Sequence, residues 1–153
     1  MQSDLLTTEQ LRLQVEKLHI QHIKLCQDNF LYFVQEVWPD FICRKEKQRS
    51  KWGHHQIIAN EFTKISDNKK GRLIINMPPR HTKSEFASVY YPAWIIGRNP
   101  KMKIMQVSHN TELAVRFGSK VRNIIDSPEY KQIFGDVKLR EDSKAKGRWE
   151  TNH

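Results

Sequence analysis

A short apolar run that turns through two prolines into a helix sets the main limit on the fold of this chain. It reads RLIINMPPRHTKSEFAS and occupies residues 72–88. Residues 72–77 are apolar and of strand length, which is typical of a strand buried on both faces. The helical pattern that follows opens with Lys83 and Ser84. A strand, a loop and a helix beginning with Lys-Ser is the order found in phosphate-binding loops.

The loop has the chemistry of a phosphate site without its usual glycines. Free amides and the helix dipole attract an anion at a helix N-terminus. Lys83 would contact the outer phosphates, and the Ser84 hydroxyl would help to hold Mg²⁺. The generic pattern has glycine where this chain has Met77 and Thr82, and a left-handed backbone at Thr82 would cost about 1–2 kcal/mol. Two interpretations stay open: a nucleotide-binding loop, or a structural proline turn that precedes a lysine.

Arg80 favours the nucleotide interpretation. Its planar guanidinium matches phosphate oxygens, and it would stabilise the charge that develops during phosphoryl transfer. The alternative for Arg80 is a salt bridge with a nearby carboxylate such as Glu85.

The remainder of the chain alternates helical patterns with one further strand-like run. Apolar periodicity predicts helices over residues 8–37, 52–65 and 83–96, a further helix that ends at 125, a short helix from Pro128, and a strand over 101–108. The predicted N-caps are Thr7 or Thr8 for the first helix, Ser108 or Asn110 for the helix that ends at 125, and Ser127 before the short helix. Strands that alternate with helices of this length predict an α/β fold with parallel strands and right-handed crossovers.

Two of the predicted helices have one apolar face each. The face of the first is expected to pack inward, with its histidine as a half-buried packing residue; it consists of Leu11, Val15, Leu18, His22 and Leu25. His54 and His55 in the second helix are adjacent and so are expected to point apart, which argues against a metal site there.

The chain is strongly basic, with 26 Lys and Arg against 17 Asp and Glu and a net charge of +9. This balance favours a polyanionic partner such as nucleic acid, although a merely basic surface would have the same composition. The basic run 44–51 either contacts DNA phosphates or is a solvated connector. Cys26 and Cys43 lack metal-ligand spacing and are expected to be reduced and structural. No apolar run reaches bilayer length and no leader opens the chain, so we expect an intracellular protein.

Several segments together resemble one protein family. RLIINMPPRHTKSEFAS resembles the variant Walker A segment of the large terminase subunits of tailed bacteriophages, in which threonine before the lysine is common. GHHQIIANEF upstream and, downstream, SHNTELA, SPEYKQIF and DSKAKGRWET are similar to the ATPase half of the same family. The resemblance covers roughly residues 30–153.

The resemblance implies an ATPase motor subunit that drives viral DNA into the procapsid. The implied fold is α/β, the first part of a RecA-like P-loop sheet, preceded by an N-terminal helical segment. Residues 1–50 would be a helical lead and basic loop, and 51–153 an incomplete ATPase domain. The implied cofactors are ATP and Mg²⁺. The implied partners are double-stranded viral DNA, the portal protein, the small terminase subunit and further copies in a ring, in the host cell cytoplasm and away from membranes.

The resemblance also assigns roles within the loop. Lys83 would contact the β- and γ-phosphates, Ser84 would help to hold Mg²⁺, and Arg80 would stabilise charge during transfer. Backbone groups of residues 80–85 would surround the phosphates, and Gln56 would approach the adenine. The implied nucleotide-binding set is therefore Gln56, Arg80, His81, Thr82, Lys83, Ser84 and Glu85, with Arg80 and Lys83 catalytic.

The chain departs from the family after Trp149. The acidic Walker B pair and the nuclease aspartates would follow that point, so we expect residues 1–153 to be the N-terminal part of a longer protein. Such a part is expected to leave the strands 72–77 and 101–108 with unpaired edges, to bind nucleotide weakly and not to hydrolyse it. The rival hypotheses are a non-catalytic nucleic-acid-binding module and a fragment of another P-loop enzyme, such as a helicase.

Overall fold

The computed structural model of the protein describes residues 7–38, 53–68, 71–144 and 149–153. The helical elements are α1 (Thr8–Asp28), α2 (Phe30–Val37), α3 (His54–Asn68), α4 (Lys83–Glu85), the π-helical turn η1 (Phe86–Tyr90), α5 (Tyr91–Arg98), α6 (Thr111–Asp126) and α7 (Pro128–Ile133). The strands are β1 (Leu139–Lys144) and β2 (Trp149–Thr151). The basic run 44–51 and Cys43 lie outside the described residues.

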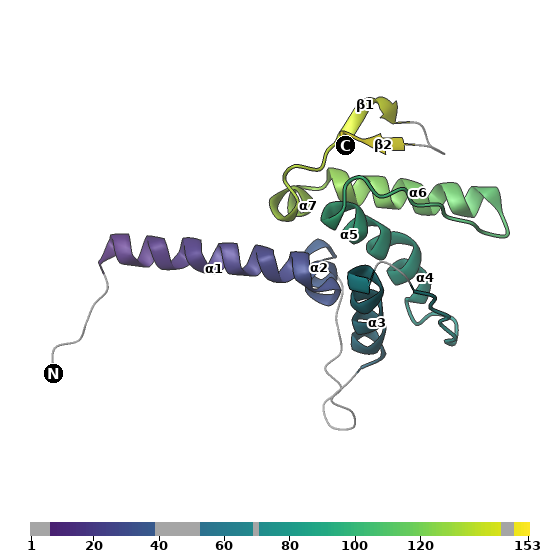
Figure 1. The fold of residues 1–153 in the computed structure, drawn as a ribbon, viewed down its shortest axis with the longest axis horizontal. Helices are drawn as coiled ribbons and strands as arrows, with labels where there is room; N and C mark the ends of the chain where they lie inside the picture. Colours follow the sequence, from purple (N-terminus) through teal and green to yellow (C-terminus); the bar gives the residue numbers. More distant parts are fainter. Residues whose placement is uncertain (1–6, 39–52, 69–70, 145–148) are drawn as a thin grey trace.

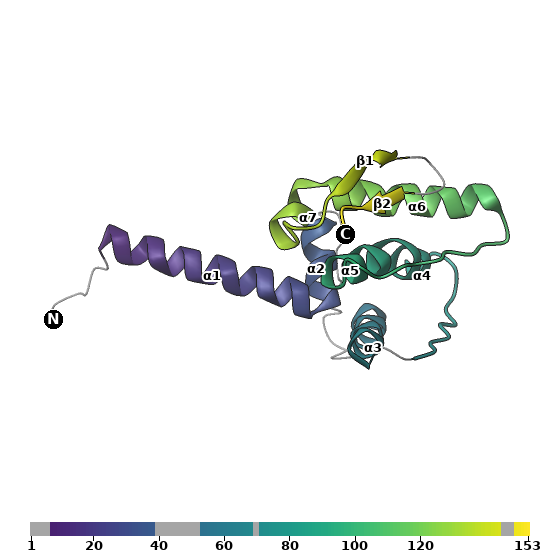
Figure 2. The ribbon, with the colours of Figure 1, turned by 45° about the horizontal axis from the view of Figure 1, so that its top comes forward.

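The predicted RecA-like sheet of parallel strands is wrong. Within the described residues the sheet consists of β1 and β2, which pair antiparallel. They lie against α6, where the Trp149 indole donates a hydrogen bond to the Gly118 carbonyl over 3.1 Å (Figure 2). The described part of the chain is therefore predominantly helical (Figure 1).

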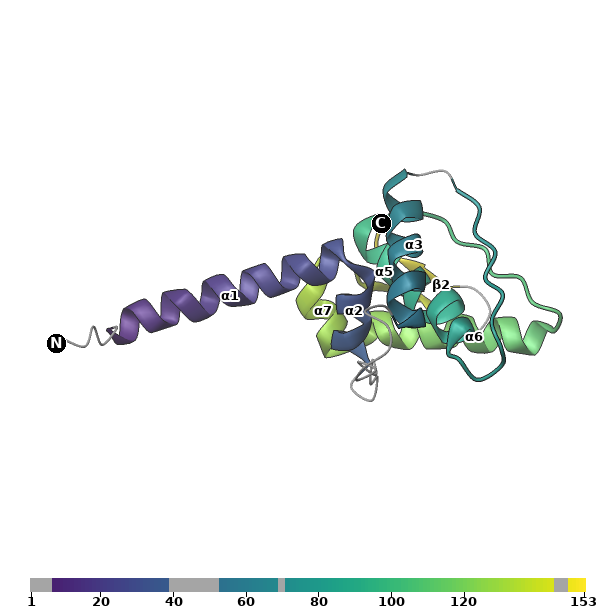
Figure 3. The same ribbon diagram turned by 90° about the horizontal axis from the view of Figure 1, so that it is seen from below.

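The two segments predicted as parallel strands are extended but unpaired. Within the described chain, neither 72–77 nor 103–108 makes a backbone–backbone hydrogen bond. Their side chains remain outside as well, since Ile74 is 85%, Met105 87% and Val107 85% exposed. Figure 3 shows both segments as plain loops on the side of the molecule opposite the N-terminal end of α1. Apolar, β-branched residues favour an extended backbone, but a strand needs a neighbour to pair with.

The core centres on the ring of Phe30 in α2. Its centroid lies 5.4 Å from that of Phe62 in α3, 5.5 Å from Phe86 in η1, and 5.7 and 5.5 Å from Tyr91 and Trp94 in α5. The first three pairs meet edge to face, a favoured arrangement of aromatic rings. This cluster joins the N-terminal part of the chain to the helix that follows the proline loop.

The helix predicted over residues 8–37 is two helices, because the backbone turns at Asn29. That residue is extended, with φ −129° and ψ 117°, and its side chain accepts from the amides of Leu31 and Tyr32 at the start of α2. The N-cap predicted at Thr7 or Thr8 is at Thr7, where Gln10 completes a capping box. The break turns α2 back toward the last turns of α1.

The apolar face predicted for the first helix does not pack inward. Within α1, Cys26 is the buried residue, whereas Leu11 is 48%, Val15 65% and Leu18 58% exposed. Most of α1 projects from the body of the molecule, as Figures 1 and 2 show. Its spacing is amphipathic, but the described chain has no surface against this face.

The helix after the proline loop is continuous from Lys83 to Arg98 and contains one irregularity. The five residues of η1 adopt a π-helical turn immediately before α5. Pro92 has no amide proton for the Ser88 carbonyl, which instead accepts a 2.5 Å bond from the Gln106 side chain. This contact ties the extended segment 103–108 to the helix.

The later helix starts agree with the sequence. Asn110 caps α6 by accepting from the amides of Glu112 and Leu113. Ser127 caps α7, and Pro128 occupies its first position. Local capping signals therefore predicted these boundaries well.

Candidate nucleotide site

The proline loop adopts a left-handed backbone at two residues that are not glycine. Arg80 has φ 65°, and Thr82 has φ 59° with ψ 5°. A left-handed residue other than glycine costs about 1–2 kcal/mol. Thr82 directly precedes the right-handed residues of α4, and a left-handed residue beside a right-handed one turns successive amides toward one point, a concavity that binds anions.

Lys83 closes the loop on itself. Its ammonium donates a hydrogen bond to the carbonyl of Met77 over 2.9 Å, so the lysine that opens the helix reaches back to the end of the extended segment. No carboxylate of the described chain pairs with Lys83. An ammonium has three donors, and a neutral carbonyl is a weaker partner than an anion. The Lys83 ammonium can therefore exchange this contact for a phosphate.

Glu85 turns away from the loop. Its carboxylate pairs with the Lys120 ammonium of α6 at 2.5 Å. Arg80 is exposed and forms no hydrogen bond or ion pair with the described residues. The alternative of an Arg80–Glu85 salt bridge is therefore wrong, and the guanidinium remains available at the mouth of the loop.

The start of α3 packs against the loop through histidines. The Thr82 hydroxyl lies 2.7 Å from Nε2 of His55 and 2.7 Å from the His81 carbonyl, and His81 Nδ1 lies 2.9 Å from the Pro79 carbonyl. The rings of His54 and His55 have centroids 3.8 Å apart, so the prediction that they point apart is wrong. These contacts support the left-handed turn at Thr82 from the side.

Burial and neighbouring charge keep His55 neutral. Desolvation first, and then the charges of His54 and His81, lower the pKa of His55 from 6.5 to about 4. At neutral pH His55 is therefore a hydrogen-bonding partner of Thr82 rather than a cation.

Gln56 and Ser84 lie on either side of this loop. Gln56 follows His55 in α3, and its side-chain amide donates to Asn60, one turn further along the helix, over 2.8 Å. Ser84 is exposed and borders a groove of about 640 Å³ that runs along Ser88 and Tyr91 toward Met105. This volume suits a small ligand, but residues 80–83 do not line the groove. Of the predicted nucleotide-binding residues, Ser84 is the one that borders this groove.

Several contacts of the loop had no signal in the sequence. The Lys120 partner of Glu85 is 35 residues away, and the His55 partner of Thr82 is 27 residues away. The carbonyl that receives Lys83 belongs to the backbone of Met77, which any residue type would supply. Only the tertiary structure brings these groups together.

Within the described residues, none of the helices has the length and apolarity needed to cross a membrane. Comparisons of the chain with protein-family models, with curated proteins and with solved structures found no match.

Proposed function

We propose that the loop of residues 78–85 binds Mg-ATP and that the protein is the ATPase motor subunit of a viral DNA-packaging machine, of the large-terminase kind. The observation that carries the proposal is the left-handed backbone of Thr82 immediately before Lys83. Generic phosphate-binding loops have glycine at this position. The proposal depends on the loop and on the sequence resemblance.

The strain in the loop supports a binding role over a plain proline turn. Type I and type II turns accept proline without a left-handed threonine. Two left-handed residues that are not glycine store about 1–3 kcal/mol each, and such strain concentrates at ligand sites. His55 supports Thr82 by a hydrogen bond across 27 residues, so the turn is held from outside as well.

Each side chain has a role that its environment permits. Lys83 would leave the neutral Met77 carbonyl for the β- and γ-phosphates, whose negative charge makes them stronger partners for an ammonium. The exposed hydroxyl of Ser84 would join the shell of Mg²⁺, and Arg80 would reach the outer phosphate. Viral DNA, the portal protein, the small subunit and further copies of the chain are the partners that this function implies.

Binding of Mg-ATP to residues 1–153, followed by calorimetry or a fluorescent ATP analogue, tests the proposal. We expect weak binding that Lys83→Ala reduces by about tenfold or more, since a hydrogen bond to a charged group is worth about 1.5–3 kcal/mol. Lys131→Ala is the matched control, because Lys131 pairs with Asp126 away from the loop. Absence of binding, or equal binding by the Lys83→Ala protein, would rule the loop out.

The net charge of +9 favours one rival, a nucleic-acid-binding module without catalysis. That function predicts DNA binding that weakens steeply with salt and does not respond to ATP or to Lys83→Ala. A gel-shift titration at two salt concentrations, with and without Mg-ATP, separates the two functions.

A further inference from the structure

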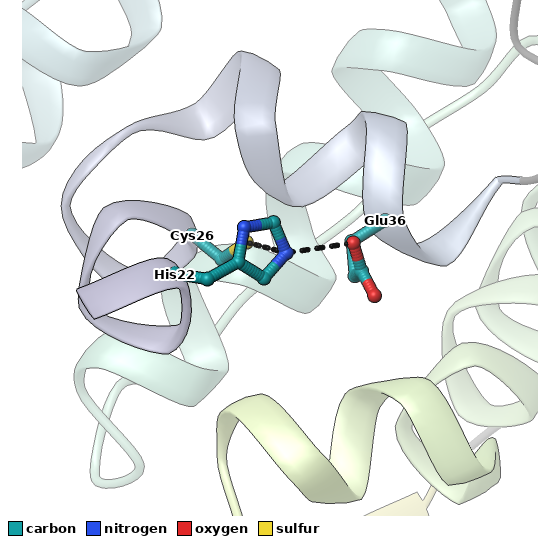
Figure 4. A group of neighbouring side chains, drawn as sticks. All are labelled: His22, Cys26 and Glu36. Atoms are coloured by element: carbon teal, nitrogen blue, oxygen red, sulfur yellow. Dashed lines mark hydrogen bonds and ion pairs between the residues drawn. The ribbon is translucent and has the colours of Figure 1, made fainter. Parts of the chain in front are cut away.

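We propose that His22, Cys26 and Glu36 form a zinc-binding site between α1 and α2, separate from the nucleotide loop. Nε2 of His22 lies 2.9 Å from Oε2 of Glu36 and 3.7 Å from Sγ of Cys26. All three donor atoms lie within 4.8 Å of one another. Figure 4 shows the three side chains converging, two from α1 and one from α2.

The local fold explains why these residues meet. His22 and Cys26 are four residues apart on α1 and therefore share one face of the helix. The break at Asn29 turns α2 back, so that Glu36, in its last turn, lies opposite that face. The spacing of the cysteines from each other does not reveal a His-x₃-Cys pair whose third ligand comes from another helix.

Two of the three separations are close to those around a tetrahedral zinc ion. Zinc bonds of about 2.0–2.1 Å to nitrogen and about 2.3 Å to sulfur put the two donors about 3.6 Å apart, and the observed separation is 3.7 Å. A nitrogen and a carboxylate oxygen would be about 3.3 Å apart, against 2.9 Å here. The carboxylate of Glu36 lies within 4.8 Å of the Cys26 sulfur and would have to settle at about 3.6 Å from it; the Glu36 side chain is 37% exposed and has room to move.

Convergence on one nitrogen distinguishes this cluster from a plain helix–helix hydrogen bond. A single ring N–H can bond well to one acceptor, yet both the thiol and the carboxylate approach the same Nε2. A cation shared by the three donors accounts for that arrangement directly. The mixed set of nitrogen, sulfur and oxygen donors suits Zn²⁺ and does not suit Mg²⁺ or Ca²⁺.

Zinc would also balance the charges of the site. Cys26 is fully buried. On binding, the S–H bond breaks, an S–Zn bond forms and the proton passes to solvent. The thiolate and carboxylate then neutralise the two charges of the ion. His22 is 48% exposed, so a water molecule can occupy the fourth position, as in zinc sites with three protein ligands.

The position of the site indicates a structural role. The indole of Trp94 donates to the Cys26 carbonyl over 3.0 Å, and Gln27 donates to the Ile133 carbonyl over 2.6 Å. Both contacts belong to the last turns of α1, while most of that helix projects from the body (Figure 1). A metal at His22 and Cys26 would extend this attachment by one turn and fix the direction of α1 relative to α2.

Cobalt titration of the reduced, EDTA-treated 153-residue chain tests the proposal. We expect one Co²⁺ per chain, with the near-ultraviolet charge-transfer band of a Co–thiolate bond, and displacement of the cobalt by Zn²⁺. Cys26→Ser should abolish the band. Glu36→Gln and His22→Gln should weaken binding by about tenfold or more. His19→Gln is the matched control, since His19 is an exposed histidine of the same helix and should leave the affinity unchanged.

Several results would contradict the zinc site. The proposal is overturned if stoichiometric cobalt produces no thiolate band, if the band survives Cys26→Ser, or if His19→Gln weakens binding as much as His22→Gln. Because Cys26 is buried and its replacement could unfold the chain, Glu36→Gln carries the decisive comparison, with circular dichroism to establish that it is folded. Zinc should raise the Tm of the wild-type chain more than that of Glu36→Gln, and equal shifts would count against the site.

Discussion

The aromatic cluster around Phe30 and the extended segments 72–77 and 103–108 are both strongly apolar, but only the cluster is buried. Phe30 and Trp94 are fully buried, while Ile74, Met105 and Val107 are 85–87% exposed. The helices that carry the cluster satisfy most of their backbone hydrogen bonds internally and need only an apolar surface to pack against. An extended segment also needs a neighbouring strand. An apolar sequence is therefore sufficient to bury the helical cluster around Phe30, but it is not sufficient to bury the extended segments.

The largest expected effect comes from making the same substitution in the buried core that surrounds the aromatic cluster and in an extended segment. Ile125→Ala removes a fully buried side chain of α6 and should lower the free energy of unfolding by about 2–5 kcal/mol. Ile74→Ala removes a side chain that is 85% exposed and should change it by less than about 0.5 kcal/mol. Urea denaturation of both variants measures the difference.

Similar losses of unfolding free energy in Ile125→Ala and Ile74→Ala would contradict this comparison, because they would mean that segment 72–77 is packed in solution. An unchanged slope of unfolding free energy against urea is the control. It establishes that each substitution alters stability and leaves the unfolding reaction the same.

Smaller effects are expected when two helical glycines are replaced by alanine, and the two replacements should change stability in opposite directions. A Cβ on Gly97 in α5 would lie 2.6 Å from ring atoms Cγ and Cε2 of Phe134, and Phe134 is itself buried. Gly97→Ala should therefore destabilise by about 1–3 kcal/mol through overpacking. Gly118→Ala in α6 meets only the Trp149 Nε1 atom at 3.7 Å and should stabilise by up to about 1 kcal/mol. Thermal unfolding of the pair checks both signs, and a stable Gly97→Ala protein would contradict the packing of α5 on Phe134.

The smallest expected effect concerns the histidines beside the proline loop. His55 has a pKa of about 4 when folded and 6.5 as its ordinary value, so the unfolded chain gains a proton first as the pH falls. Its contribution to stability is complete above pH 6.5 and is lost as the pH falls toward about 4.

The Tm of wild-type protein should accordingly fall between pH 7 and pH 5 by more than the Tm of His55→Gln. His19→Gln, on the exposed part of α1, should follow the wild type. An identical fall in the His55→Gln protein would mean that the His55 ring is solvated and that α3 does not support the loop.

The sequence was most informative where the determinant is local. Thr7, Asn110 and Ser127 all cap helices at or beside the positions predicted for them, because a cap depends on the next three residues. At the proline loop the sequence indicated a left-handed Thr82 only as a cost of about 1–2 kcal/mol to a phosphate-binding loop, and the structure has that conformation. Nucleotide binding itself stays a prediction.

Predictions from the sequence were wrong where the structure of a segment depends on what packs or pairs against it. Residues 72–77 and 101–108 have the composition of buried strands but form no strand, and neither 72–77 nor 103–108 makes a backbone–backbone hydrogen bond within the described chain. Helix α1 has an apolar stripe with Leu18 58% exposed. Periodicity shows which residues can share a face and does not show what that face contacts. The zinc cluster was missed for the same reason, because Glu36 joins His22 only after the chain turns at Asn29.

By itself the sequence determined the capped helix starts and the basic charge, since each follows from residues within a few positions or from composition. Only the tertiary structure decided that the strand-like segments stay unpaired, that His55 bonds the Thr82 hydroxyl and that His22, Cys26 and Glu36 converge. Those outcomes depend on which distant groups meet, and a contact between distant residues is chosen by the packing of the whole chain, because no local preference specifies its partner.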